Sequence, residues 1–236
     1  MIMRQSAGQI PLALGLQDKP GFELYVVGNN TEALHNIKSI AKGNKQSCLY
    51  VWGMKGSGIS HLLQAACILA HERNRTAAYI PLIELVDLEP EILENMDNMD
   101  MICIDDFDLV CGKRRWELAI LHLYNRLRDS KHSLLIGAHT NPQTLAIKLQ
   151  DLKSRLAWDL VYHLQVLDDA DKIEVLQRRA NARSFDLPRE VADYIVNHSK
   201  RGLTDLLSIL EVLEQATLVE QRKLTIPFVK KILELK

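Results

Sequence analysis

The stretch WGMKGSGISH, Trp52–His61, fits a phosphate-binding loop at every position but one. In the pattern G-x-x-x-x-G-K-[ST], Gly53 and Gly58 are the two glycines, Ser60 is the hydroxyl residue, and Ile59 stands where lysine is expected. Such a loop wraps backbone N–H groups around a phosphate at a helix N-terminus, and its lysine adds a positive charge. The stretch therefore predicts a loop that has the backbone cradle but lacks the usual cation.

The composition excludes several classes of protein. Hydrophobic residues make up 47% of the 236 residues and charged residues 25%, which is typical of a globular chain and neither disordered nor membrane-spanning. The four cysteines lie in separate segments without metal-ligand spacing, so we expect reduced thiols. The apolar part of the N-terminal segment is too short and broken for a secretory signal, so we expect a cytoplasmic protein. A formal net charge of −1 gives no overall electrostatic drive toward DNA.

Two patterns divide the chain near residue 167. Before it, short apolar or β-branched runs at 47–52, 76–81, 100–105, 133–138 and 160–165 alternate with helical patterns, which indicates a parallel sheet with crossover helices. After it, only amphipathic helical patterns follow, at 168–185, 188–199, 203–223 and 225–236. The predicted fold class is α/β: a flexible tail at 1–18, an α/β domain at 19–166, and a small all-α domain at 167–236.

Polar residues follow the third and fourth apolar runs. Asp105 and Asp106 lie where a P-loop protein places its Mg²⁺-binding acid and the acid that polarises the attacking water; the alternative is a buried strand that ends in a polar turn. His139 and Thr140 could contact a γ-phosphate or the lytic water, or form a solvent-facing turn. The three cations at 113–115 lie near an expected helix start, where the helix dipole disfavours positive charge. They indicate either an anionic partner or a solvated basic turn.

The tail segment QIPLAL, residues 9–14, places apolar side chains ahead of the first core element. These residues either pack back onto the domain or anchor the chain in a pocket of another protein. Arg155, in the helical stretch 151–156, is by itself an ordinary solvated arginine or one that acts on a partner.

Taken together, these segments resemble the AAA+ ATPases of the DnaA group over nearly the whole chain. The similar segments are FELYVVGNN (22–30) at the adenine pocket, SHLL (60–63) after the loop, the acids at 105–106, LKSR (152–155) and LTIPFVK (224–230). The chain ends where the initiator would continue into a DNA-binding domain, which favours a regulatory relative of the initiator.

The resemblance implies a set of site residues. Arg155 would be an arginine finger that acts in trans, Asp105 and Asp106 the Walker B acids, and Ser60 with Asp105 the Mg²⁺ ligands when nucleotide is bound. The implied nucleotide-binding residues are Val27, Gly28, Gly53, Gly56, Ser57, Gly58, Ile59, Ser60, His61 and Thr204. The departures from the family fall on Ile59, His139 and Thr204, the last of which replaces the second-sensor arginine. We therefore expect no intrinsic ATPase activity, and either weak binding of ADP or another nucleoside diphosphate or a loop that is purely structural.

The resemblance also implies partners. Gln9, Ile10, Leu12 and Leu14 resemble the hexapeptide that inserts into the sliding clamp of the replicative polymerase. The expected function is inhibition of replication initiation: bound to the DNA-loaded clamp, the chain promotes hydrolysis of ATP on the DnaA initiator. DNA would be contacted mainly through the clamp, with no membrane partner, and a homo-oligomer is compatible with the sequence. The alternatives are an autonomous ATPase of the helicase-loader type and a DNA-binding initiator paralogue.

Overall fold

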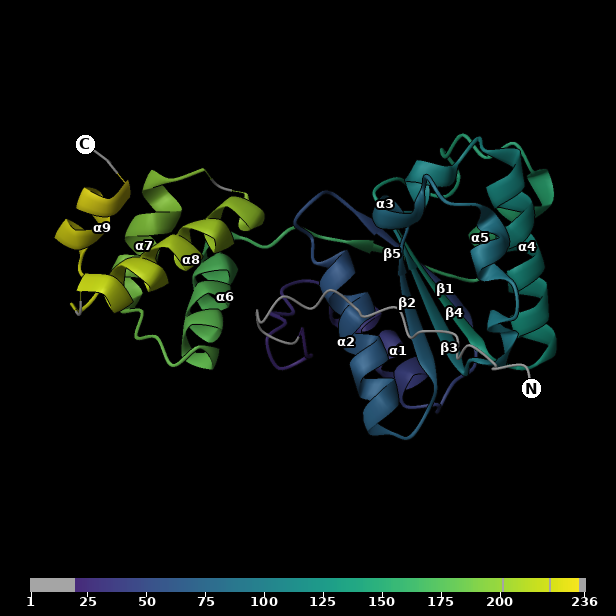
Figure 1. Ribbon diagram of the computed structural model, residues 1–236, viewed down its shortest axis with the longest axis horizontal. Helices are drawn as coiled ribbons and strands as arrows, with labels where there is room; N and C mark the ends of the chain where they lie inside the picture. The colour runs from purple at the N-terminus through teal and green to yellow at the C-terminus, as the bar shows by residue number, and fades with distance from the viewer. Residues whose placement is uncertain (1–19, 201, 221, 234–236) are drawn as a thin grey trace, which may run out of the picture.

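A five-stranded parallel sheet forms the centre of the larger part of the chain (Figure 1). The computed structural model describes residues 20–200, 202–220 and 222–233. The predicted tail, with its proposed clamp-binding residues Gln9, Ile10, Leu12 and Leu14, lies outside the described residues. The strands are β1 (Cys48–Gly53), β2 (Ala77–Pro81), β3 (Met101–Asp105), β4 (Ser133–Ala138) and β5 (Leu160–Leu164), in the order β2-β3-β4-β1-β5. Each lies within one residue of its predicted ends.

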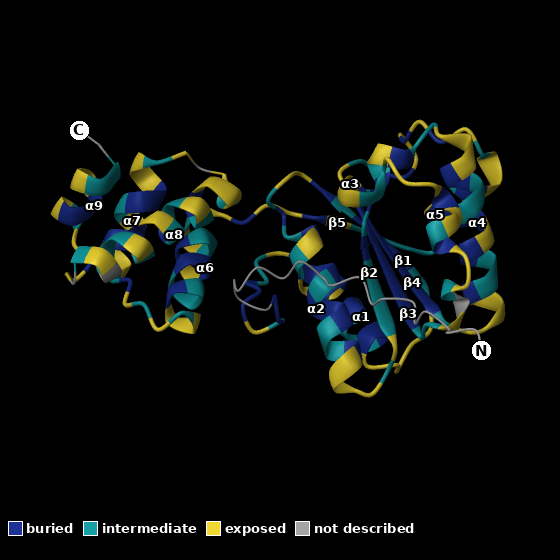
Figure 2. Ribbon diagram, viewed as in Figure 1, coloured by how far each residue is buried: buried dark blue, intermediate teal, exposed yellow. Residues whose placement is uncertain are grey.

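Helices cover both faces of this sheet. Helices α1 (Thr31–Ala41) and α2 (Ile59–Glu72) lie on one face, and α4 (Arg114–Asp129) and α5 (Gln150–Trp158) on the other (Figure 1). Shorter elements connect the strands: α3 (Leu82–Leu85) and the 3₁₀ helices η1 (Pro90–Leu93), η2 (Met96–Asn98) and η3 (Phe107–Val110). Because parallel strands with crossover helices are enclosed on both sides, β3 and β4 are buried along their whole length (Figure 2).

The helical region that follows β5 has its own apolar core. It contains α6 (Asp169–Ala182), α7 (Arg189–His198), α8 (Leu203–Glu220) and α9 (Ile226–Leu233). The Asp168 carboxylate caps α6 by accepting the Asp171 backbone N–H at 2.8 Å. A smaller apolar cluster of Val26, Leu167 and Val175, with Leu203 and Leu207 against it, joins this region to the sheet domain. The predicted fold class, a parallel α/β sheet followed by a helical lid, is confirmed.

Candidate functional site

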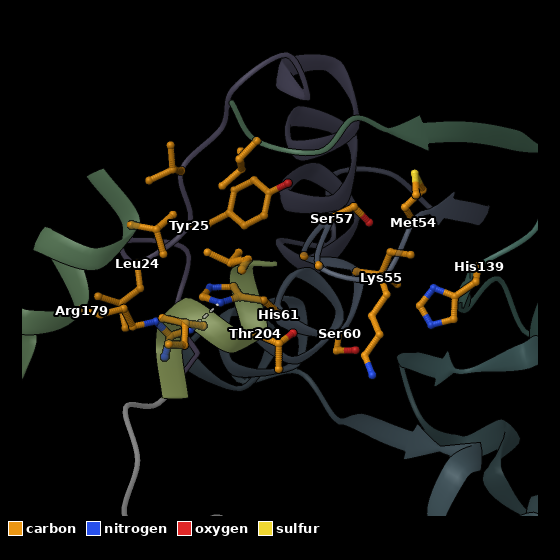
Figure 3. A pocket seen from close by; sticks show the side chains of 18 of the residues that line it. Leu24, Tyr25, Met54, Lys55, Ser57, Ser60, His61, His139, Arg179 and Thr204 are labelled. Carbon is orange, nitrogen blue, oxygen red and sulfur yellow. Dashed lines mark hydrogen bonds between the residues drawn. The ribbon is translucent and has the colours of Figure 1, made fainter. Parts of the chain in front are cut away.

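A cleft of about 330 Å³ lies between the loop after β1 and the helical lid (Figure 3). The sheet domain contributes residues 24–26, the loop and the start of α2 (54–61), Asp106 and His139. The lid contributes apolar side chains and two polar ones, Arg179 on α6 and Thr204 on α8. The cleft therefore lies where the carboxyl ends of the parallel strands meet the N-terminus of α2, the usual place for a ligand in such sheets.

The backbone of the loop has the shape of a phosphate cradle. Gly56 and Gly58 both have φ +88°, a left-handed conformation that favours glycine. A Cβ atom at Gly58 would lie 2.9 Å from the Tyr25 ring, and one at Gly53 would lie 2.8 Å from the Ser57 hydroxyl oxygen. At the first and last glycines of the motif, neighbouring atoms therefore leave no room for a side chain.

The Ser57 hydroxyl group tests whether the cleft fits a phosphate. Its hydroxyl oxygen is buried, lines the cleft and has no hydrogen-bond partner among the described residues. Buried hydroxyl groups in proteins are nearly always hydrogen-bonded, and an unpaired one costs about 1–3 kcal/mol. A bound phosphate oxygen would accept this hydrogen bond, so the residues present fit a phosphate group.

Ile59, in the lysine position of the motif, is part of the hydrophobic core. It is 4% exposed and packs with the residues between the sheet and α2. Contact with β4 is close, because a Cβ atom at Gly137 would lie 2.5 Å from Ile59 Cγ2 and 2.8 Å from a methyl group of Leu63. The side chain thus contributes apolar packing and no charge.

Asp105 is held behind the cleft by the chain's own donors. Its carboxylate accepts a hydrogen bond from the Tyr79 hydroxyl at 2.7 Å and from the Asp106 backbone N–H at 3.0 Å. It is 2% exposed and does not line the cleft. Burial, followed by the charge of Asp105, raises the pKa of Tyr79, so this hydroxyl stays a donor at neutral pH. Of the two residues expected to bind Mg²⁺, Ser60 lines the cleft and Asp105 does not.

Asp106 and His139 face each other at the edge of the cleft. Asp106 has φ +56°, and burial and the neighbouring Asp105 charge raise the pKa of its carboxyl group. His139 Nε2 lies 3.5 Å from Asp106 Oδ1, and His139 Nδ1 lies 3.1 Å from the Gly53 carbonyl oxygen. The imidazole therefore links the first glycine of the loop to the end of β3, and its nitrogens are occupied within the chain.

On the lid side, Arg179 contacts the P-loop helix. Its guanidinium lies 3.0 Å from His61 Nδ1, while His61 Nε2 lies 2.8 Å from the Gly21 carbonyl oxygen. Because a carbonyl group only accepts, Nε2 carries the hydrogen and Nδ1 accepts from Arg179. Burial, together with the Arg179 charge, lowers the pKa of His61 to about 4. His61 is thus a neutral link between the lid and the sheet domain.

The adjacent Arg178 fixes the lid to the chain segment before α1. It donates to the carbonyl oxygens of Glu23 at 3.1 Å and Tyr25 at 3.0 Å, and it pairs with Glu174 on its own helix. Tyr25 in turn packs against Gly58 in the loop. The wall of the cleft formed by residues 24–26 is therefore attached to the lid.

Most of the predicted nucleotide-binding residues come together here. Gly56, Ser57, Gly58, Ile59, Ser60, His61 and Thr204 line the cleft, and Gly53 adjoins it through Ser57. Val27 and Gly28 are not among the lining residues, because the preceding residues 24–26 form that wall. Sequence reasoning missed Lys55 and Arg179, which line the cleft, and it placed Tyr25 in the adenine-pocket segment 22–30 without naming it as a site residue. Lys55 carried a signal, since it is a basic residue inside the loop itself.

Arg155 does not line the cleft. It lies on α5, which packs on the opposite face of the sheet from α2, away from the lid (Figure 1). Its guanidinium pairs with Asp151 at 3.2 Å, donates to the Asn125 side chain and lies 5.4 Å from the centre of the Tyr124 ring. The side chain is 28% exposed, so it is ordered by its neighbours but still accessible to a partner.

Two other sequence features are also located. The basic turn begins α4, and Arg115 pairs with Glu89 at 2.6 Å and Glu91 at 3.0 Å, so part of its charge is matched within the chain. No cluster of three or more metal-ligating side chains occurs within residues 20–200, 202–220 and 222–233. Across those same ranges, no helix combines the length and apolar character that crossing a bilayer requires.

Comparison with known proteins agrees with this geometry. A glycine-rich loop between β1 and α2 of a parallel β2-β3-β4-β1-β5 sheet, followed by a helical lid, defines a AAA+ nucleotide-binding fold. The family model for the bacterial DnaA ATPase domain matches residues 16–163, and the model for the Hda lid domain matches residues 169–233. The chain belongs to the bacterial DnaA ATPase family. With its Hda-type lid, it is a DnaA-related replication regulator.

Solved structures show the same fold. Domain III of the DnaA replication initiation protein from Thermotoga maritima is 23% identical, with a TM-score of 0.79 over 92% of this chain and 97% of that one. AMPPCP-bound DnaA from Aquifex aeolicus is 21% identical, with a TM-score of 0.70 over 84% of this chain and 66% of that one. The RuvB branch-migration motor of Thermotoga maritima is 16% identical, with a TM-score of 0.67 over 87% and 68%.

Proposed function

We propose that this chain inhibits repeated initiation of replication by stimulating hydrolysis of ATP bound to the DnaA initiator, while residues of its tail hold it on the DNA-loaded sliding clamp. The observation that carries the proposal is the position of Arg155. It lies on a surface helix of a DnaA-family domain, away from that domain's own cleft. An arginine so placed is suited to a nucleotide on a neighbouring molecule.

The chain's own cleft is proposed to bind ADP and not to hydrolyse ATP. Hydrolysis needs cations against the charge that develops on the γ-phosphoryl oxygens. Ile59 is apolar and buried, and Thr204 is uncharged. Asp105, the acid expected to bind Mg²⁺, is occupied by Tyr79 and the backbone of Asp106. The glycine cradle remains, together with the Ser57 hydroxyl, which has no hydrogen-bond partner among the described residues, and these groups suit a diphosphate.

The catalytic site is proposed to be completed at the boundary between the two proteins. Water attacks the γ-phosphorus of ATP on the initiator, the bond to the β–γ bridging oxygen breaks, and ADP and phosphate leave. Arg155 would donate to the γ-phosphoryl oxygens as charge builds there; trans fingers of this kind accelerate hydrolysis by about 10³–10⁵. Asp151 and Asn125 already orient the planar guanidinium, so little side-chain freedom remains to be lost on docking.

The test measures ATP hydrolysis by the initiator on clamp-loaded DNA. Arg155→Ala should remove most of the stimulation, and Arg155→Lys should restore little because an ammonium group lacks the planar fork. Arg128→Ala, an exposed arginine on the adjacent α4, is the matched control and should stimulate like the parent protein. The thermal midpoint of Arg155→Ala should change little, since partly exposed ion pairs contribute about 0–1 kcal/mol. Undiminished stimulation by Arg155→Ala would rule out the trans mechanism.

A further inference from the structure

Most of the basic side chains that line the cleft contact polar groups of the same chain. Arg179 contacts His61, His61 also contacts the Gly21 carbonyl group, and His139 lies between Gly53 and Asp106. The remaining basic side chain is Lys55. Within the described part of the chain, its ammonium group forms no hydrogen bond or ion pair, and it lines the cleft.

We propose that Lys55 supplies the positive charge that the loop has lost at position 59 and binds the β-phosphate of a nucleoside diphosphate. In the sequence G-M-K-G-S-G-I-S, the cation is thus moved four residues toward the N-terminus. This inference rests on the proposed nucleotide site. It adds a residue that the family pattern does not assign and a reason for the cleft to prefer a diphosphate to a monophosphate.

The geometry of the loop supports Lys55 as the replacement for the cation that is absent at position 59. Ile59 points into the core against β4, whereas Lys55 is exposed on the outer lip of the loop, before Gly56. In Figure 3 the Lys55 chain extends to the same side of the loop as the Ser60 hydroxyl group. A lysine has a flexible four-carbon stem and a compact charge, so it can reach a phosphate from the lip without a fixed approach angle.

The groups around the loop favour a phosphate at this point. The backbone N–H groups at the start of α2 are uncharged donors, and so is the Ser57 hydroxyl, which is unpaired within the described part of the chain. Nearby, the carboxylate of Asp106 has its Oδ1 atom 3.5 Å from His139 Nε2. Of the two cations among the described lining residues, Arg179 belongs to the lid and is hydrogen-bonded to His61, so Lys55 is the one that the loop itself places beside a bound anion.

The experiment measures binding of ADP and AMP to the isolated full-length chain by calorimetry. The parent protein should bind ADP more tightly than AMP. Lys55→Gln should weaken ADP binding by roughly 10-fold or more, the scale of a charge-assisted hydrogen bond, and leave AMP binding unchanged. Lys55→Arg should keep most of the preference for ADP. Lys42→Gln, at an exposed lysine after α1, is the control and should bind like the parent.

Two results would overturn the inference: equal affinity of the parent chain for ADP and AMP, or an unchanged preference for ADP in Lys55→Gln. A loss of affinity for both nucleotides in Lys55→Gln would also count against it, because that outcome indicates a damaged cleft. The measurement contains no initiator, clamp or DNA. It can therefore fail while Arg155-dependent stimulation holds, and it can succeed while that stimulation fails.

Discussion

Lowering the pH should weaken the contact between the lid and the sheet domain at His61. In the unfolded chain an imidazole has a pKa near 6.5, whereas in the folded chain burial lowers the pKa of His61 to about 4. Between these pH values the imidazole is protonated in the unfolded chain and neutral in the folded chain. The contribution of His61 to the free energy of unfolding is therefore fully present above pH 6.5 and falls as the pH drops toward 4. Protonation removes the acceptor that Nδ1 offers to Arg179.

The size of the effect follows from the two pKa values. A difference from 6.5 to about 4 corresponds to roughly 3 kcal/mol at 1.36 kcal/mol for each pH unit, and about 2 kcal/mol of this is lost by pH 5. The charged groups nearest His61 act in opposite directions: Arg179 lowers its pKa and Glu23 raises it. Burial is the largest cause, so the net direction is downward.

The assay compares urea unfolding of the parent chain with that of His61→Gln between pH 4.5 and 8. Glutamine offers an N–H to the Gly21 carbonyl group and an oxygen to Arg179, and it does not titrate. We expect similar stability at pH 8 and an advantage for His61→Gln that grows to about 2 kcal/mol at pH 5. The difference between the two proteins cancels the titration of the carboxylates they share. A constant difference across this range, or an NMR titration that places His61 near 6.5, would refute the reasoning.

Two further predictions concern packing and the tail. Gly137→Ala should lower the free energy of unfolding by about 1–3 kcal/mol, because the added Cβ would lie 2.5 Å from Ile59 Cγ2 and 2.8 Å from Asp105 Oδ1; an unchanged thermal midpoint would show that β4 and α2 separate easily. Deleting residues 1–15 should abolish clamp binding and leave the thermal midpoint unchanged, since these residues precede the described core. A clamp pull-down tests this, and equal capture of the truncated chain would contradict the anchor.

The sequence was sufficient for the elements of the sheet because each strand is signalled locally. Apolar runs of five or six residues bounded by polar or glycine positions located all five strands to within one residue. The short 3₁₀ helices η1, η2 and η3 carry no such periodicity and were not predicted. The four lid helices could be predicted because each has an apolar face, which in the structure packs into one core.

The site residues also divide into those that a local sequence motif predicts and those that only folding brings together. The loop residues are contiguous, so their gathering at the cleft follows from one motif. Arg179 is 118 residues from His61, and only the packing of the lid brings the two together. Resemblance assigned Val27 and Gly28 to the nucleotide, yet the lining is formed by 24–26, in the stretch whose carbonyl groups accept hydrogen bonds from Arg178 on α6.

The hydrogen bonds from Arg178 to the Glu23 and Tyr25 carbonyl groups also limit how far from the cleft a partner bound to the tail can lie. Ten residue-to-residue steps separate Leu14 from Leu24, and a fully extended chain spans at most about 3.3–3.6 Å for each step. The binding site of a partner that binds Leu14 therefore lies within roughly 35 Å of the wall of the cleft. Because that wall is bonded to α6 and packed on Gly58, a pull on the tail would reach the lid and the phosphate cradle without first passing through the sheet.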